Sequence, residues 1–99
     1  MKEEYKSEGK IIFVVSENEV FISMDTIMKD IIKPQKFYYQ GGMLGYSKGY
    51  FIKDNINVEI EYADWFGTEL KITEDLENEK IDKVRNWVRI IKENIGKQG

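Results

Sequence analysis

The sequence feature that most constrains the fold is an apolar side chain at every second position of residues 56–62. Ile56, Val58, Ile60 and Tyr62 alternate there with Asn57, Glu59 and Glu61. Because successive side chains of a strand point to opposite faces, this stretch predicts a strand with one covered and one wet face. Residues 68–73 alternate in the same way, with Leu70 and Ile72 expected inward. The chain must therefore supply an apolar cover for one face of a sheet.

The C-terminal part of the chain has the pattern of that cover. From Asn78 onward the apolar residues recur at helical intervals: Ile81, Val84, Trp87, Val88, Ile91 and Ile95. They span an arc of about 120°, the width expected of a helix lying on a core. Gly96 is a suitable residue to end this helix. Ile90 falls outside the arc, so it is either exposed or part of an oligomer contact.

The N-terminal third is less regular. Residues 1–9 are polar and mixed in charge, which predicts a loose lead-in. The β-branched run in residues 10–15 favours a central strand covered on both faces, and residues 20–24 are expected to return as the second arm of a hairpin. Asp25 is a suitable cap for a short helix that Pro34 ends, since proline disfavours the α conformation of the preceding residue.

These elements predict one α+β domain over residues 1–99, with the order β-β-α-β-β-β-β-α. We expect an antiparallel sheet of about five to six strands, because the connections are short. A short helix follows the second strand, and the C-terminal amphipathic helix packs on one face of the sheet.

Composition excludes several kinds of chemistry. The 99 residues contain neither cysteine nor histidine, so disulfides, thiolate zinc sites and Ser–His or Cys–His nucleophiles are excluded within this chain. No apolar run approaches the roughly 20 residues needed to cross a bilayer, and the first residues lack the apolar segment of a signal peptide. We therefore expect a cytoplasmic protein that is not bound to a membrane.

Residues 36–53 are the most unusual stretch. They hold six of the thirteen aromatic residues, four of the eight glycines and three lysines, with no acid. The glycines suggest a phosphate-binding loop, but neither GxxxxGK[ST] nor GxGxxG occurs, and the residues that follow resemble a strand. The glycines are therefore expected to serve as turn or bulge residues in a sheet: Gly41, Gly42, Gly45 and Gly49.

The aromatic residues of this stretch predict a contact surface, because tyrosine and tryptophan offer large, stiff contact areas with a polar tip. Phe37 and Phe51 are expected in the core. The predicted partner-binding residues are Tyr38, Tyr39, Tyr46, Lys48, Tyr50 and Lys53. Trp65, in a turn between two predicted strands, is either a further contact residue or a plug at one end of the core.

The function favoured by these features is a small non-enzymatic binding or inhibitory protein that acts by protein–protein contact, without cofactor or metal. Bacterial immunity proteins and phage-encoded inhibitors are small acidic proteins of this type, and the comparison is an analogy only. The net charge is −3, while residues 29–53 carry five lysines and one aspartate. The acidic flanks suit a basic enzyme or toxin as partner.

Three alternatives remain. Single-stranded nucleic acid could stack its bases on the tyrosines while lysines follow its backbone. A metal-dependent nuclease-like site is the second, because the Glu69-x-Lys71 spacing is similar to that of PD-(D/E)xK-type nucleases, with Asp54 or Asp64 completing a magnesium site. The third is a homo-oligomer that associates through an uncovered sheet edge or through Trp87 and Ile90.

Overall fold

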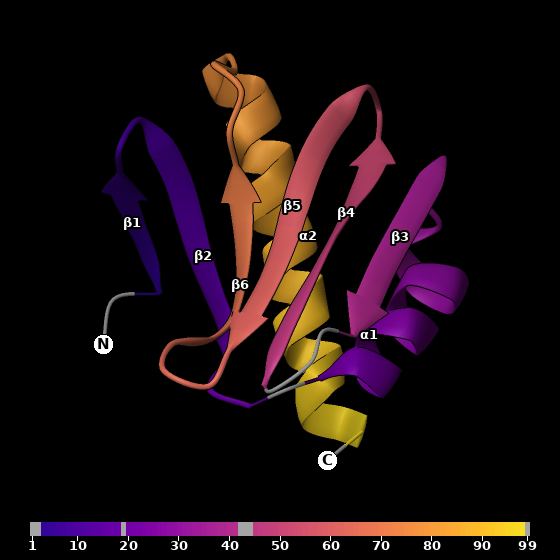
Figure 1. Cartoon of the computed structure of the whole chain (residues 1–99). Helices are drawn as coiled ribbons and strands as arrows, with labels where there is room; N and C mark the ends of the chain where they lie inside the picture. Colours follow the sequence, from indigo (N-terminus) through magenta and orange to yellow (C-terminus); the bar gives the residue numbers. More distant parts are fainter. Residues whose placement is uncertain (1–2, 19, 42–44, 99) are drawn as a thin grey trace.

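The computed structural model describes residues 3–18, 20–41 and 45–98. It contains a six-stranded antiparallel sheet with helices on one side, in the strand order β1-β2-β6-β5-β4-β3 (Figure 1). The strands are β1 (Glu4–Ser7), β2 (Lys10–Ser16), β3 (Lys36–Gly41), β4 (Tyr46–Lys53), β5 (Ile56–Ala63) and β6 (Gly67–Ile72). The predicted α+β class is confirmed.

The long helix α2 (Asn78–Gln98) covers the sheet from behind in the view of Figure 1. Its apolar stripe lies in the core, where Val84 and Ile91 are fully buried. The predicted helix is confirmed, although it continues through Gly96 to Gln98. Among the described residues, no helix combines the length and apolarity needed to cross a membrane.

Two residues of α2 considered for self-association lie against the core instead. Trp87 is buried and packs edge-on against Phe51 of β4, with ring centroids 5.9 Å apart. Ile90 is half-buried and also packs on the core. Trp87 is therefore part of the core, and Ile90 is the more accessible of the two residues.

The predicted hairpin arm at residues 20–24 is wrong, because this stretch begins helix α1 (Phe21–Ile27), which continues into a π-helical turn (Met28–Ile32). The buried residues Val20, Met24, Ile27, Met28 and Ile32 follow helical spacing. Ile22, in contrast, is 81% exposed. Packing of this stripe on the core therefore overrides the strand preference of the β-branched and aromatic residues.

The end of this helical segment agrees with the sequence prediction. Lys33 takes a left-handed conformation with φ 52°, directly before Pro34. Asp25 lies inside α1 and pairs with Lys29 at 2.9 Å, so it does not cap the helix as predicted. The residue at the N-cap position is Val20, which makes no side-chain capping bond.

The predicted loose lead-in is also wrong over residues 4–7, which form the edge strand β1. It pairs antiparallel with β2, with Glu4 opposite Phe13 and Ser7 opposite Lys10. Glu8 and Gly9 form the turn with positive φ angles of 52° and 78°. The predicted order of elements therefore holds, but its first two strands are β1 and β2.

The sheet has two different faces. Residues opposite each other on antiparallel strands point to the same side, so the pairing register shows which residues share a face. A central row across five strands faces the helices: Phe13, Leu70, Ile60, Gly49 and Tyr39. We call the other side the outer face. It carries Tyr5, Ile12, Val14, Lys36, Tyr38, Gln40, Tyr46, Lys48, Tyr50, Asn57, Glu59, Glu61, Glu69 and Lys71.

Gly49 lets β3 and β4 approach each other closely under the helices. A Cβ atom at this position would lie 2.2 Å from the Tyr38 carbonyl oxygen and 2.7 Å from Tyr39 Cα. Backbone atoms cannot move aside as a flexible side chain can. Gly49 thus lies inside a regular strand with continuous register on both sides, and its predicted role as a turn or bulge residue is wrong; it permits close packing instead. Gly42 lies outside the described residues.

We predict that Gly49→Ala lowers the free energy of unfolding by about 1–3 kcal/mol, the usual cost of overpacking a core. Gly41→Ala is the matched control, because a Cβ at Gly41 meets no atom within 4 Å. Urea unfolding of the two variants measures the difference. Equal stability of both would contradict the close approach at Gly49.

Candidate functional site

The outer face is the candidate functional site, because no described helix covers it. Figure 1 shows both helices behind the sheet. Two halves of this face differ in how well their polar groups are paired. The half that runs from β1, β2 and β6 to the Tyr46–Glu61 hydrogen bond is closed by its own side chains. The half around Tyr38 and Tyr50 is more open.

A chain of hydrogen bonds and ion pairs closes the first half. Tyr5 donates to Glu69 at 2.6 Å, and Tyr46 donates to Glu61 at 2.5 Å. Lys71 bonds to Glu61 and lies 4.0 Å from Glu69. Glu69 is only 4% exposed although it is on the outer face. A buried carboxylate needs such partners, because its unpaired charge would be costly.

The pairing shifts the pKa of Glu61, Tyr5 and Tyr46. Burial raises the pKa of Glu61, but hydrogen bonds from Lys71 and Tyr46 outweigh it, and the pKa lies below its ordinary value. The hydrogen bond to Glu69 raises the pKa of Tyr5 to about 12, and the bond to Glu61 raises that of Tyr46 to about 12. At neutral pH the carboxylate of Glu61 is charged and both hydroxyls keep their protons.

We predict an alkaline loss of stability from this network. The folded state holds the Tyr5 and Tyr46 protons more tightly than the unfolded chain, whose ordinary pKa is 10.0. The stabilisation is therefore complete below pH 10 and falls as the pH rises towards about 12. Urea midpoints over this range measure it. The double variant Tyr5→Phe and Tyr46→Phe should decline less steeply; an equal decline would contradict the assignment.

The second half of the outer face contains two neighbouring tyrosine rings. Tyr38 of β3 is 51% exposed, and its ring centroid lies 6.2 Å from that of Tyr50 on β4. The Tyr38 hydroxyl donates to Gln40 at 2.5 Å. Lys48 is exposed on the next position of this face. These residues surround an open depression of about 340 Å³.

The other predicted contact residues have different placements. Tyr39 was expected at the surface but is buried on the helix side, because its position opposite Gly49 points it into the core. Tyr46 is on the outer face but is bonded to Glu61. Lys53 ends β4 and is half-buried, on the helix side by strand alternation.

Trp65 and the predicted core aromatics also have clear positions. Trp65 is 79% exposed in the turn between β5 and β6, with its ring edge-on to Phe66 at 5.6 Å, so it does not plug the core. Phe51 is fully buried as predicted, and Phe37 is half-buried against the core.

The nuclease-like alternative needs either Asp54 or Asp64 beside Glu69 and Lys71, and both aspartates have other partners. Asp54 precedes β5 and Asp64 follows it. Asp54 pairs with Lys83 at 3.6 Å, and Asp64 accepts a hydrogen bond from Tyr62 at 2.6 Å. Glu69 and Lys71 do share a face as the spacing predicted. Within the described ranges, no three acidic side chains are grouped to hold a metal ion.

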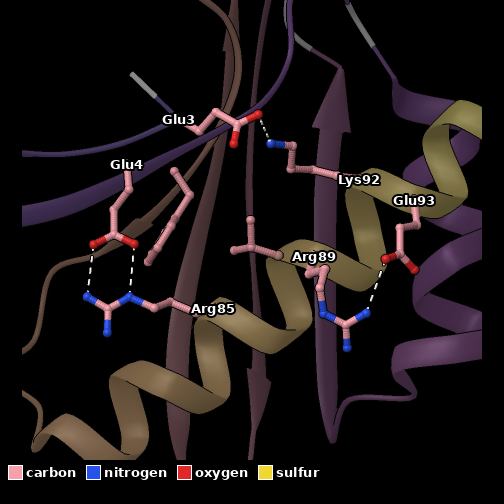
Figure 2. Close-up of a pocket in the computed structure, with 8 residues that line it drawn as sticks. Glu3, Glu4, Arg85, Arg89, Lys92 and Glu93 are labelled. Carbon is pink, nitrogen blue, oxygen red and sulfur yellow. Dashed lines mark hydrogen bonds and ion pairs between the residues drawn. The ribbon is translucent and has the colours of Figure 1, made fainter. Parts of the chain in front are cut away.

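A second cavity, of about 400 Å³, lies between the β1 edge and α2 (Figure 2). Its floor is apolar, formed by Phe13 and Val88. The charged groups around it are already paired with one another: Glu4 with Arg85 at 2.9 Å, Glu3 with Lys92, and Arg89 with Glu93 at 3.1 Å. The first two pairs attach the N-terminal edge of the sheet to the helix, and the third lies within α2, so the charged groups have a structural role.

The ion pair between Glu4 and Arg85 allows the attachment of β1 to α2 to be tested. Arg85 donates two hydrogen bonds to Glu4 and lowers the pKa of that carboxyl. We predict that Arg85→Gln costs less than about 1 kcal/mol of global stability, because the pair is exposed, yet speeds amide hydrogen exchange in β1. Arg89→Gln is the matched control, since Arg89 bonds only within α2. Similar exchange in β1 for both variants would contradict the attachment.

Sequence reasoning missed several residues of the outer face. Tyr5 was placed in the loose lead-in, and Glu59, Glu61 and Asn57 were interpreted as a solvated strand face. Their alternation showed the side on which they lie. Their pairing depends on the register between strands, which no local pattern reveals.

Comparisons with models of known protein families, with curated proteins and with solved structures find no match.

Proposed function

We propose that this protein is a non-enzymatic binding or inhibitory domain that contacts another protein through the open half of its outer face. The observation that carries the proposal is the pair of adjacent tyrosines, Tyr38 and Tyr50, on a sheet face that no described helix covers. Partly exposed tyrosines on a rigid sheet are suited to binding, because little conformational entropy is lost when they are buried.

The charge arrangement supports a protein partner. Lys48 and Glu59 lie beside the tyrosines on adjacent strands, and neither forms an ion pair or hydrogen bond with the described residues. Unpaired charges of both signs give a contact surface orientation and specificity. The net charge of −3 favours a basic partner, such as an enzyme or toxin whose active site the domain would occlude.

Polar pairing elsewhere on the outer face supports a non-enzymatic role. Glu61, Glu69 and Lys71 are held in mutual bonds, which leaves no free acid and base pair among them. A general base needs a proton to accept from a substrate within hydrogen-bond reach. Groups that are already satisfied suit a rigid support for the adjacent contact residues.

We predict that Tyr38→Ala combined with Tyr50→Ala weakens partner binding by about tenfold or more, the effect of removing interface hot spots. The partner is first identified with a photo-crosslinking amino acid in place of Tyr38 in the native cell, then purified for calorimetric titration. Ile22→Ala is the matched control, because Ile22 is 81% exposed on α1, behind the sheet.

Two outcomes would contradict the proposal. Equal affinity of the double tyrosine variant and the Ile22 variant would show that the partner binds elsewhere. Saturable, salt-dependent binding of a single-stranded oligonucleotide, abolished in the double tyrosine variant, would assign the tyrosines to base stacking instead.

A further inference from the structure

We propose that the depression beside Tyr38 and Tyr50 takes an arginine side chain of the partner. This inference rests on the proposed function, and it names the chemistry that the partner presents. It follows from four groups that line the depression: the two tyrosine rings, the carboxylate of Glu59 and the amide of Asn57. All four are on the outer face of β3, β4 and β5.

Glu59 is a half-buried carboxylate without a counterion among the described residues. It lies opposite Tyr50 on one side and opposite Lys71 on the other. Lys71 bonds to Glu61 instead, and its ammonium group also lies 4.0 Å from the carboxylate of Glu69. Glu59 is therefore the carboxylate of this face that is left open to a cation from outside.

Asn57 adds a second acceptor without a donor. Its side-chain oxygen is buried, and no hydrogen bond reaches it from the described residues. Buried polar atoms are nearly always satisfied in native proteins. The residue itself lines the depression, so a donor bound there can reach the oxygen once the amide side chain turns outward. Asn57 and Glu59 are two positions apart on β5, hence on the same face and about 7 Å apart along the strand.

A guanidinium group matches these surroundings better than other ligands. It is planar, carries five donors, and stacks on aromatic rings while its edges donate to carboxylate and amide oxygens. An ammonium group is more strongly hydrated and cannot stack in this way. An anion would meet Glu59 and the Asn57 oxygen, both acceptors.

Lys48 is on the rim of the same depression and repels a cation. Its charge acts also on Glu61, the residue opposite it on β5, and contributes to lowering the pKa of that carboxyl. The exposed side chain has room to extend towards solvent. Lys48 therefore limits the affinity and favours a ligand that adds stacking to its charge.

The test uses N-acetyl-argininamide as probe, titrated into the isotope-labelled protein and followed by amide chemical shifts. We expect saturable, millimolar binding with shifts centred on Tyr50 and Glu59. N-acetyl-citrullinamide is a neutral probe of the same shape. It should bind with an affinity lower by about tenfold or more, because a charge-assisted hydrogen bond is lost. N-acetyl-lysinamide should fall between the two.

Glu59→Gln should weaken arginine binding by about tenfold as well. Glu79→Gln is the matched control, since it removes one negative charge from the exposed first turn of α2. The amide spectrum itself reports whether each variant is folded. Absence of saturable shifts, equal binding of the citrulline probe, or unchanged binding in Glu59→Gln would each overturn the inference.

The same variant separates this inference from the proposed function. A protein partner that needs Tyr38 and Tyr50 but binds Glu59→Gln with unchanged affinity would overturn the arginine site alone. Arginine binding in the depression, together with a partner that is insensitive to both tyrosines, would overturn the proposed contact surface alone.

Discussion

The structure depends on one constraint: two helices can cover only one face of a six-stranded sheet. The covered side takes nearly all of the large apolar side chains, with Trp87 of α2 edge-on to Phe51 of β4 at its centre. The outer side must therefore be stabilised by its own side chains and by water. Some residues of the outer face are stabilised by pairing with one another, and these have a structural role. Those that remain open to water are the candidate functional residues.

Over β1, β2 and β6 the demand is met by internal pairing. Tyr5 opposes Ile12 and donates to Glu69, so the edge strand shields both an apolar residue and a carboxylate from water. The edge strand in turn is attached to α2 by the Glu4 pair with Arg85. Short, charged edge strands of this kind also discourage unwanted pairing with other chains. This half of the face therefore satisfies its polar groups with its own side chains.

The sequence predicted the parts of the fold that depend on local periodicity. The strand at residues 56–62 and the helix from Asn78 were correct because their patterns are long and regular. Residues 20–24 were assigned to a strand because the helical stripe that includes Met24 continues past them, beyond the reach of a short window. Tyr38 and Tyr39 could not be told apart, because only the register with β4 places Tyr39 opposite Gly49. The candidate site could not be predicted for a similar reason, because the sequence does not show that Lys71 bonds to Glu61 and not to Glu59.

The bond between Lys71 and Glu61 determines which carboxylate of the outer face is left without an ion pair. Lys71 lies directly opposite Glu59 on the neighbouring strand, where a cross-strand ion pair would be favourable, yet it bonds to Glu61. As a result, Glu59 has no counterion among the described residues. The side-chain oxygen of Asn57, two positions away on β5, accepts no hydrogen bond from the same part of the chain. An unsatisfied buried acceptor costs about 1–3 kcal/mol, so a fold optimised for stability alone would pair these groups. Their position beside two accessible tyrosine rings is where binding of a donor-rich group would recover that free energy.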